Sequence, residues 1–218
     1  MYTHILTTIT LLTALHGASS QMMTGKLGNA MAITNNPPGA IYTATINSDS
    51  MNPVKGKVIA MSNPNGKGVM FNLTLMNLPM MGGPFSYHLH DQPVASNGDC
   101  GSTLAHLDPY QRGQATTCDM TVPETCEVGD LSGKHGKVEG MEVMKSFVDQ
   151  YAALVPGIGA FFGNRSIVIH FANSTRLACA NFTTGMADMG MSMSMMPTST
   201  SMPMPMPTKP GRMCGKKD

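Results

Sequence analysis

The sequence contains no tryptophan, and aromatic residues make up only 6% of its 218 residues. Net charge is also scarce, because 14 Lys and Arg stand against 13 Asp and Glu. A chain without an excess of basic residues does not attract nucleic-acid phosphates, so no nucleic-acid partner is expected. No apolar run reaches the length of about 18 residues that a membrane-spanning helix needs. We therefore expect no transmembrane segment.

The two ends of the chain differ in composition from the middle. Residues 1–20 carry a short apolar run followed by the small residues Ala18-Ser19-Ser20, which is typical of a secretory signal peptide. Residues 21–39 are polar and contain Gly and Pro, and we expect a loose lead-in there. Residues 183–218 alternate Met with Ser, Pro and Gly, which cannot bury a core and predicts a disordered tail. The composition predicts a secreted protein with one folded domain over residues 40–182.

The methionine-rich tail allows two interpretations. Thioether sulfur is a soft ligand that prefers Cu(I), so the tail is a candidate Cu(I)-binding segment. The alternative is a spacer that tethers the domain at a cell wall. Composition alone leaves both open.

Four N-glycosylation acceptor motifs agree with secretion. They begin at Asn72, Asn164, Asn173 and Asn181. The five cysteines also fit an oxidising compartment, in which disulfides form and persist.

Between the two ends, short segments of alternating apolar and polar residues predict an all-β domain. The predicted strands cover residues 40–46, 57–61, 69–75, 85–90, 146–151, 166–171 and 176–182. With turn signals between them, about eight short strands are typical of a sandwich or barrel. Residues 91–140 break the pattern, and loops of this length inside a compact domain are usually functional.

The strand over residues 85–90 carries the first chemical signal. His88 and His90 are two residues apart, so both imidazoles project to the same face of a strand. Imidazole suits copper, zinc, iron or nickel, and the pair makes half of a metal site. On its own the pair fits equally well with surface or core polar pairing. His106 and His170 are the downstream histidines that strengthen the metal interpretation.

Taken together, these residues resemble the copper-only superoxide dismutases of fungal cell surfaces, a branch of the Cu/Zn superoxide dismutase family. The resemblance runs from about residue 40 to 182 and is densest over 85–90, 105–110, 125–137 and 157–182. It implies an eight-stranded Greek-key β-barrel that converts superoxide to oxygen and hydrogen peroxide by one-electron cycling of one copper ion per chain. The copper ligands implied by position are His88, His90, His106 and His170.

The resemblance also assigns roles to other residues. Arg176 matches the active-site arginine that attracts the anionic substrate, and His106 would carry a proton. Cys100 and Cys179 match the intrasubunit disulfide. For the remaining cysteines, we expect Cys118 and Cys126 to close a small local loop, with Cys214 left over.

One departure from the wider family concerns zinc. Ordinary members place two zinc-binding histidines between the bridging histidine and a zinc-binding aspartate, which match His106 and Asp130 here. No histidine lies between these two positions, so no zinc is expected. Asp130 and Glu127 then become the candidates for orienting the outer nitrogen of His106. His135 follows Asp130 and is interpreted as a solvated or loop-bonding residue.

Two rival functions remain open at the level of sequence. The same site on the same fold would also suit an extracellular protein that binds or delivers copper without turnover. A structural surface glycoprotein is less consistent, because the four proposed ligands and Arg176 are all present.

Overall fold

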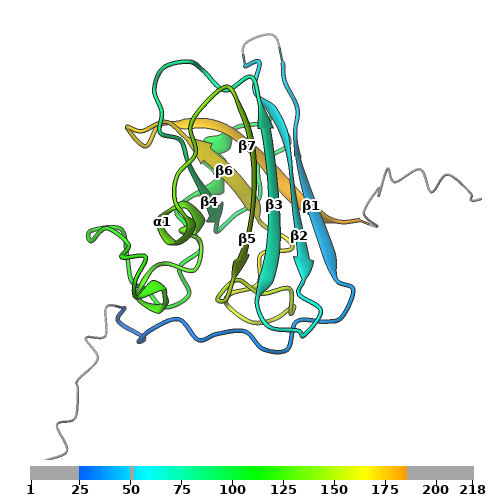
Figure 1. The fold of residues 1–218 in the computed structure, drawn as a ribbon, viewed down its shortest axis with the longest axis vertical. Coiled ribbons are helices and arrows are strands. Elements are labelled where there is room, and N and C mark those ends of the chain that lie inside the picture. Colours follow the sequence, from blue (N-terminus) through cyan, green and yellow to red (C-terminus); the bar gives the residue numbers. More distant parts are fainter. Residues whose placement is uncertain (1–24, 50–51, 186–218) are drawn as a thin grey trace, which may run out of the picture. The chain divides into compact units, whose positions relative to one another are not determined.

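The structure, a computed structural model, describes residues 25–49 and 52–185 (Figure 1). The expected signal peptide, Cys214 and almost all of the methionine-rich tail lie outside the described residues. Within the described ranges, no helix is both long enough and apolar enough to cross a bilayer.

The described chain forms a seven-stranded antiparallel sheet that curls on itself. Its strands are β1 (Ile41–Ile46), β2 (Lys55–Ser62), β3 (Val69–Met76), β4 (Ser86–His90), β5 (Glu142–Asp149), β6 (Ser166–His170) and β7 (Arg176–Thr184). Their order is β4-β6-β7-β1-β2-β3-β5. The first part of β7 pairs with β6 and its last residues pair with β1, so β7 joins the two halves of the sheet (Figure 1).

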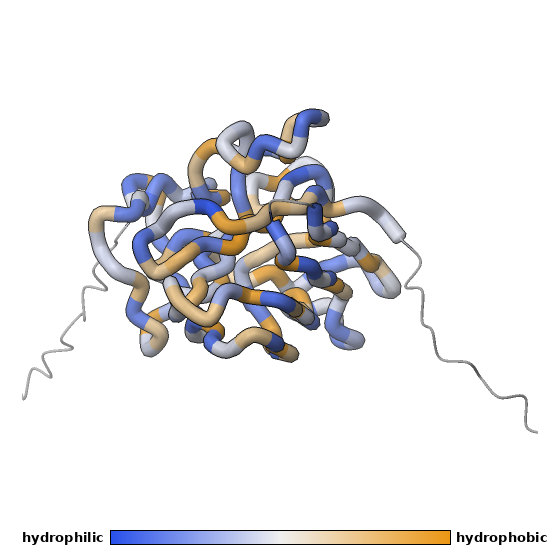
Figure 2. The backbone as a smooth tube through the Cα atoms, turned by 90° about the horizontal axis from the view of Figure 1, so that it is seen from above, coloured by the Kyte–Doolittle hydropathy of each residue, from blue (hydrophilic) through white to orange (hydrophobic). Residues whose placement is uncertain are grey.

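The all-β prediction is confirmed, with two differences in detail. Strand β5 begins at Glu142, four residues before the predicted start. The described residues hold seven strands, against the eight that the resemblance implies. The Gly-rich stretch 156–163 forms turns, with a single bridge between Ala153 and Phe161. Figure 2 shows hydrophobic and hydrophilic positions alternating along much of the chain, as expected of strands with one buried face.

The core lies on the inner face of the sheet. Strand β3 alternates buried and partly exposed residues, which puts Phe71, Leu73 and Leu75 inside. The Phe71 ring packs against Phe147 and Phe162, with both pairs of ring centroids 5.4 Å apart. Burying a side chain of this size stabilises the fold by about 1.5–3 kcal/mol relative to exposure. This packing therefore stabilises the sheet from which the loops extend.

The irregular stretch between β4 and β5 contains two short 3-10 helices, Cys100–Thr103 and Pro123–Thr125, and one helical turn, α1 (Leu131–His135). Two disulfides close parts of it. Cys100 is bonded to Cys179 on β7, and Cys118 is bonded to Cys126. Loop backbone is thereby tied both to itself and to the sheet.

The described part of the expected lead-in is ordered rather than loose. The backbone amide of Leu27 donates to the Tyr110 carbonyl, and that of Ala30 donates to the Glu124 carbonyl. Ala30 is also buried in the core. The composition of the segment does not show that its backbone pairs with loop residues 83 and 94 positions further along the chain, so the sequence alone predicts a loose lead-in.

Candidate metal centre

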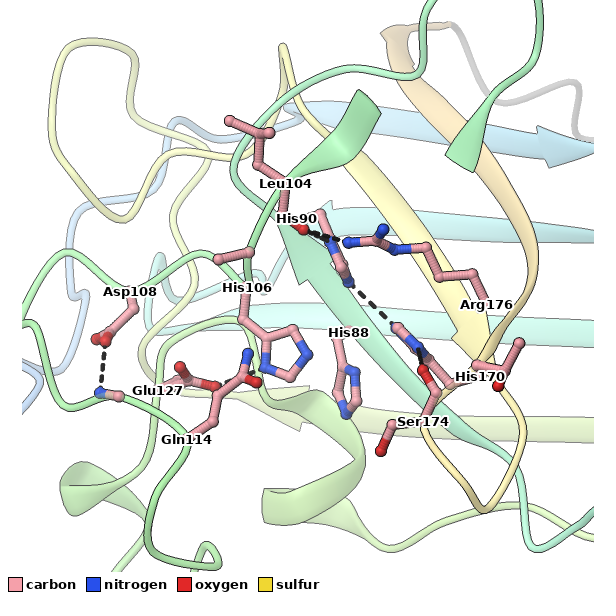
Figure 3. Close-up of a pocket in the computed structure, with 13 residues that line it drawn as sticks. His88, His90, Leu104, His106, Asp108, Gln114, Glu127, His170, Ser174 and Arg176 are labelled. Carbon is pink, nitrogen blue, oxygen red and sulfur yellow. Dashed lines mark hydrogen bonds and ion pairs between the residues drawn. The ribbon is translucent and has the colours of Figure 1, made fainter. Parts of the chain in front are cut away.

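Four histidines from three parts of the fold converge on one cavity (Figure 3). Strand β4 supplies His88 and His90, β6 ends at His170, and the loop after β4 supplies His106. One ring nitrogen of each can be chosen so that all four lie within 4.8 Å of one another. In the described ranges, no other His, Cys, Asp and Glu side chains form such a group.

Main-chain hydrogen bonds hold the His106 loop beside β4. The Leu107 amide donates to the Leu89 carbonyl at 2.9 Å, and the Gly129 amide donates to the Leu107 carbonyl at 2.8 Å. Gly129 is needed for this approach, because a Cβ there would lie 2.4 Å from the Leu89 carbonyl oxygen. Three segments distant in sequence are thus packed backbone to backbone, and His106 is held next to His90.

The outer nitrogens of His90 and His170 have hydrogen-bond partners. His90 Nδ1 lies 3.0 Å from the Leu104 carbonyl and 3.0 Å from Thr103 Oγ1. His170 Nδ1 lies 3.0 Å from the Ser174 carbonyl. A carbonyl partner requires a proton on Nδ1, which leaves Nε2 free to ligate. The two Nε2 atoms lie 3.1 Å apart in the cavity.

His106 and His88 are oriented by carboxylates. Glu127 Oε2 lies 2.6 Å from His106 Nδ1, and the Glu127 side chain is only 5% exposed. Asp130 lies instead beside His88, with its Oδ1 3.4 Å from His88 Nε2. The two carboxylates expected around His106 are therefore divided between two histidines, and Glu127 has the contact with His106.

His88 carries an unpaired nitrogen. Its Nε2 lies 3.0 Å from Ser132 Oγ, while its Nδ1 is buried and has no hydrogen-bond partner. A buried polar atom without a partner is rare and costs free energy, so it calls for an explanation. A metal ion bound by Nδ1 of His88 and Nε2 of His90, His106 and His170 provides one. This donor set of four imidazoles fits copper.

Electrostatics also favour the ligand form of these rings. Burial, together with the nearby His106 and His170 rings, lowers the pKa of His90 to about 3. Burial lowers the pKa of His170 to about 4, against a raising effect of its bond to Ser174. Burial also lowers the pKa of His88. A metal binds only neutral imidazole, so these three rings are in their binding form at neutral pH.

Asp130 has two roles in the structure. Its side chain accepts a hydrogen bond from the Gly133 amide at 2.7 Å and so caps α1. Burial alone raises the pKa of Asp130, but the hydrogen bond with His88 and the Gly133 amide outweigh burial and lower this pKa to about 2. Asp130 is therefore an anion beside the ring of His88 at neutral pH.

Arg176 lies at the rim of the same cavity, which has a volume of about 1000 Å³ (Figure 3). Its Nη2 donates to the Leu104 carbonyl at 2.5 Å, and Leu104 also bonds to His90. Cys179, three residues further along β7, carries the disulfide to Cys100. The guanidinium is thus a fixed positive charge next to the four imidazoles.

The space beside His106 that a second metal would need is taken by Glu127. His135 does not reach this region, because its Nε2 lies 2.9 Å from the buried Asp149. The interpretation of His135 as a loop-bonding residue agrees with this contact.

Sequence reasoning missed Thr103, Leu104 and Ser132. The Ser132 contact with His88 spans 44 residues, and nothing local marks it. Leu104 acts through its main chain, which any residue type has. Its φ of 58°, uncommon for leucine, is visible only in the structure.

No family model matches the sequence. Among curated proteins, the chain is 42% identical over 183 residues to a cell surface Cu-only superoxide dismutase of Arthroderma benhamiae, covering 71% of this chain and 49% of that protein. It is 35% identical over 156 residues to cell surface Cu-only superoxide dismutase 5 of Candida albicans, covering 72% of this chain and 66% of that protein. The chain thus spans about half to two thirds of these relatives.

A solved structure of superoxide dismutase 5 of Candida albicans, described as Cu(II), matches with a TM-score of 0.62 and 34% identity. The match covers 70% of this chain and 96% of that one. The four-histidine cavity lies within this shared fold. The chain therefore belongs to the family of cell surface Cu-only superoxide dismutases.

Proposed function

We propose that this protein is a copper-only superoxide dismutase that acts outside the cell or at its surface. The observation that carries the proposal is the ligand geometry. The Nδ1 atoms of His90, His106 and His170 have hydrogen-bond partners. The buried Nδ1 of His88 has none, and the guanidinium of Arg176 lies at the same cavity.

Bound copper would supply one-electron chemistry in both directions, which zinc cannot supply. Two superoxide ions and two protons then give one oxygen and one hydrogen peroxide. Arg176 draws the small anion into the cavity and holds it by charge. Glu127 keeps the proton on Nδ1 of His106. Nε2 of His106 would therefore carry a proton to the product only in the state in which it does not ligate the metal.

Several assignments outside the described cavity belong to the same proposal. Residues 1–20 would direct secretion, residues 40–182 would form the dismutase domain, and residues 183–218 would form a tail that binds Cu(I) or contacts the cell wall. Asn164 and Asn173 are proposed glycosylation acceptors, and their position in exposed turns supports this. Asn72 and Asn181 are proposed acceptors as well, although the Asn181 amide is bonded to Val94 in both directions.

The proposal predicts that copper alone restores activity. The protein is stripped of metal and reloaded with copper, and its metal content and superoxide consumption are measured before and after zinc is added. We expect about one copper per chain at the centre and full activity without zinc, because Glu127 occupies the place beside His106. Copper held by the tail is separated from copper at the centre by the Cu(II) ligand-field spectrum.

Two outcomes would contradict parts of the proposal. A tightly held, stoichiometric zinc that raises activity would exclude the copper-only assignment and leave the dismutase assignment intact. Copper held at the centre without superoxide consumption would exclude the dismutase. It would favour the copper-binding or copper-delivery alternative on the same fold.

Arg176 is predicted to act through its charge. Arg176→Lys should keep part of the rate, and Arg176→Glu should lower kcat/KM for superoxide by at least about 10-fold, because it replaces attraction with repulsion at the cavity. The wild-type rate should also fall with ionic strength, since salt screens a steered encounter. Pulse-radiolysis rates over a range of salt concentrations measure both effects.

Lys67→Glu is the matched control, because it changes net charge equally at an exposed position outside the cavity. It should change the rate far less than Arg176→Glu. Equal rates for Arg176→Glu and the wild type, with no dependence on salt, would refute the role of Arg176.

A further inference from the structure

A second cavity, of about 610 Å³, lies beside the loop that leads into β4. None of the four histidines lines it. The residues that line it include Met80, Met81, Met141 and Glu139. The three methionines are 87%, 84% and 51% exposed, so they contribute little to the core. Their presence at one cavity therefore needs a reason other than folding.

Main-chain hydrogen bonds hold the two walls of this cavity opposite each other. At one end the Leu78 amide donates to the Met141 carbonyl at 3.1 Å. At the other end the amides and carbonyls of Phe85 and Val138 are paired in both directions, at 2.8 and 2.9 Å. The segments 79–84 and 139–140 lie between these two sets of hydrogen bonds. The backbone of both cavity walls is therefore held in place without any contribution from a methionine side chain.

The segment 79–84 also contacts the residues that follow His170 at the four-histidine cavity. The Gly82 carbonyl accepts a hydrogen bond from the Ala172 amide at 2.7 Å, and a Cβ at Gly82 would lie 2.6 Å from the Phe171 ring. Phe171 directly follows the proposed ligand His170. The segment 79–84, which carries Met80 and Met81, therefore packs against Phe171 and Ala172, directly after β6.

Thioethers have a narrow ligand chemistry. They are soft donors that select Cu(I), whereas carboxylate and carbonyl oxygens suit magnesium, calcium and manganese. Unlike thiols and imidazoles, they carry no proton that a metal must displace, so their affinity for Cu(I) does not fall in mildly acidic surroundings. Glu139 adds a negative charge at the same cavity, which favours a cation.

We propose that Met80, Met81 and Met141 form a surface site that binds one Cu(I) ion. The long, unbranched side chains swing together from the fixed walls to share the ion. The site is distinct from the four-histidine centre, and it collects the reduced metal at the surface of a protein whose family uses copper. Binding at the thioethers does not depend on dismutase activity, so the two proposals fail separately.

The test uses the metal-free full chain with methyl-labelled methionine, titrated with Ag(I), a diamagnetic ion of the same charge and softness as Cu(I). Single Met→Leu variants assign the NMR signals. We expect the methyl signals of Met80, Met81 and Met141 to move together and to saturate at one equivalent for that group. Met144 is 88% exposed on β5 and does not line the cavity, so its signal should not move with them.

A Cu(I) competition against a chromogenic chelator gives the second measurement. The triple variant Met80→Leu, Met81→Leu, Met141→Leu should lose one equivalent of Cu(I) relative to the wild type, and Met144→Leu should lose none. Leucine keeps the apolar volume, and unchanged thermal unfolding shows that the variants are folded. Unmoved signals, signals that move at different Ag(I) concentrations, or an unchanged Cu(I) count in the triple variant would overturn the proposal.

Discussion

Replacing His170 with alanine should remove copper from the four-histidine centre and reduce superoxide consumption to background. The change leaves three imidazoles and an open position, and it also removes the bond that His170 makes with the Ser174 carbonyl. Copper prefers a full tetragonal set of nitrogen ligands, so affinity falls together with turnover. Metal analysis, the Cu(II) ligand-field spectrum and superoxide consumption on the purified variant measure the three effects.

His135→Gln is the matched control for that experiment. It also removes an imidazole, but His135 bonds Asp149 and lies outside the centre, and glutamine keeps an amide that can donate to the carboxylate. Copper content and activity should stay at the wild-type level. An active, copper-loaded His170→Ala protein would show that the centre has been assigned to the wrong histidines.

Replacing Asp149 with alanine should lower the free energy of unfolding by about 3–5 kcal/mol. Asp149 is completely buried, and its Oδ2 lies 2.8 Å from the Nζ of Lys134, which is itself buried. The other oxygen accepts the amides of Tyr151 and Ala152. Removing the carboxylate leaves a buried ammonium without its counter-charge. Urea unfolding with the disulfides intact measures the loss.

A second substitution separates the buried charge from general damage. The double variant Lys134→Met, Asp149→Leu removes both charges at once and should recover part of the stability lost in Asp149→Ala. If Asp149→Ala unfolds at the wild-type urea concentration, the pair is not the structural support that its geometry indicates.

Acid provides another measurement on Asp149. Burial raises the pKa of this carboxyl, but the charge of Lys134 and the bond with His135 outweigh burial and hold the pKa well below its ordinary value of 3.8. A carboxyl with a lowered pKa in the folded state stabilises the protein above its unfolded pKa. This contribution is lost as pH falls below 3.8 towards the folded pKa. In Asp149→Asn this acid-dependent loss should be absent.

The sequence predicts the parts of this protein that depend on short-range pattern. The alternation in β3 shows its buried face, and the spacing of His88 and His90 puts both rings on one side of β4. His170 is recognisable because it ends an apolar strand. In each case the information lies within a few consecutive residues, where backbone geometry alone relates position to direction.

The rest depends on contacts between distant segments. Glu127 and Asp130 are three residues apart, yet the fold sends one to His106 and the other to His88. Asp130 caps the helical turn α1, which begins at the next residue, and Lys134 in that turn contacts Asp149, 15 residues further on. No local sequence pattern indicates such a contact. The sequence therefore identifies Glu127 and Asp130 as candidates, but it does not show which histidine each one contacts.

The Leu104 carbonyl, which accepts both Nδ1 of His90 and Nη2 of Arg176, couples a proposed copper ligand to the charge at the cavity. A main-chain oxygen cannot be removed by changing a side chain, so evolution can alter this junction only through the local φ and ψ angles, here 58° and −137°. We therefore expect the energetic effects of substitutions at His90 and Arg176 to be non-additive, with a nonzero interaction energy in their double-mutant cycle. A substitution at either residue therefore changes the hydrogen bonding of an acceptor on which the other residue also depends.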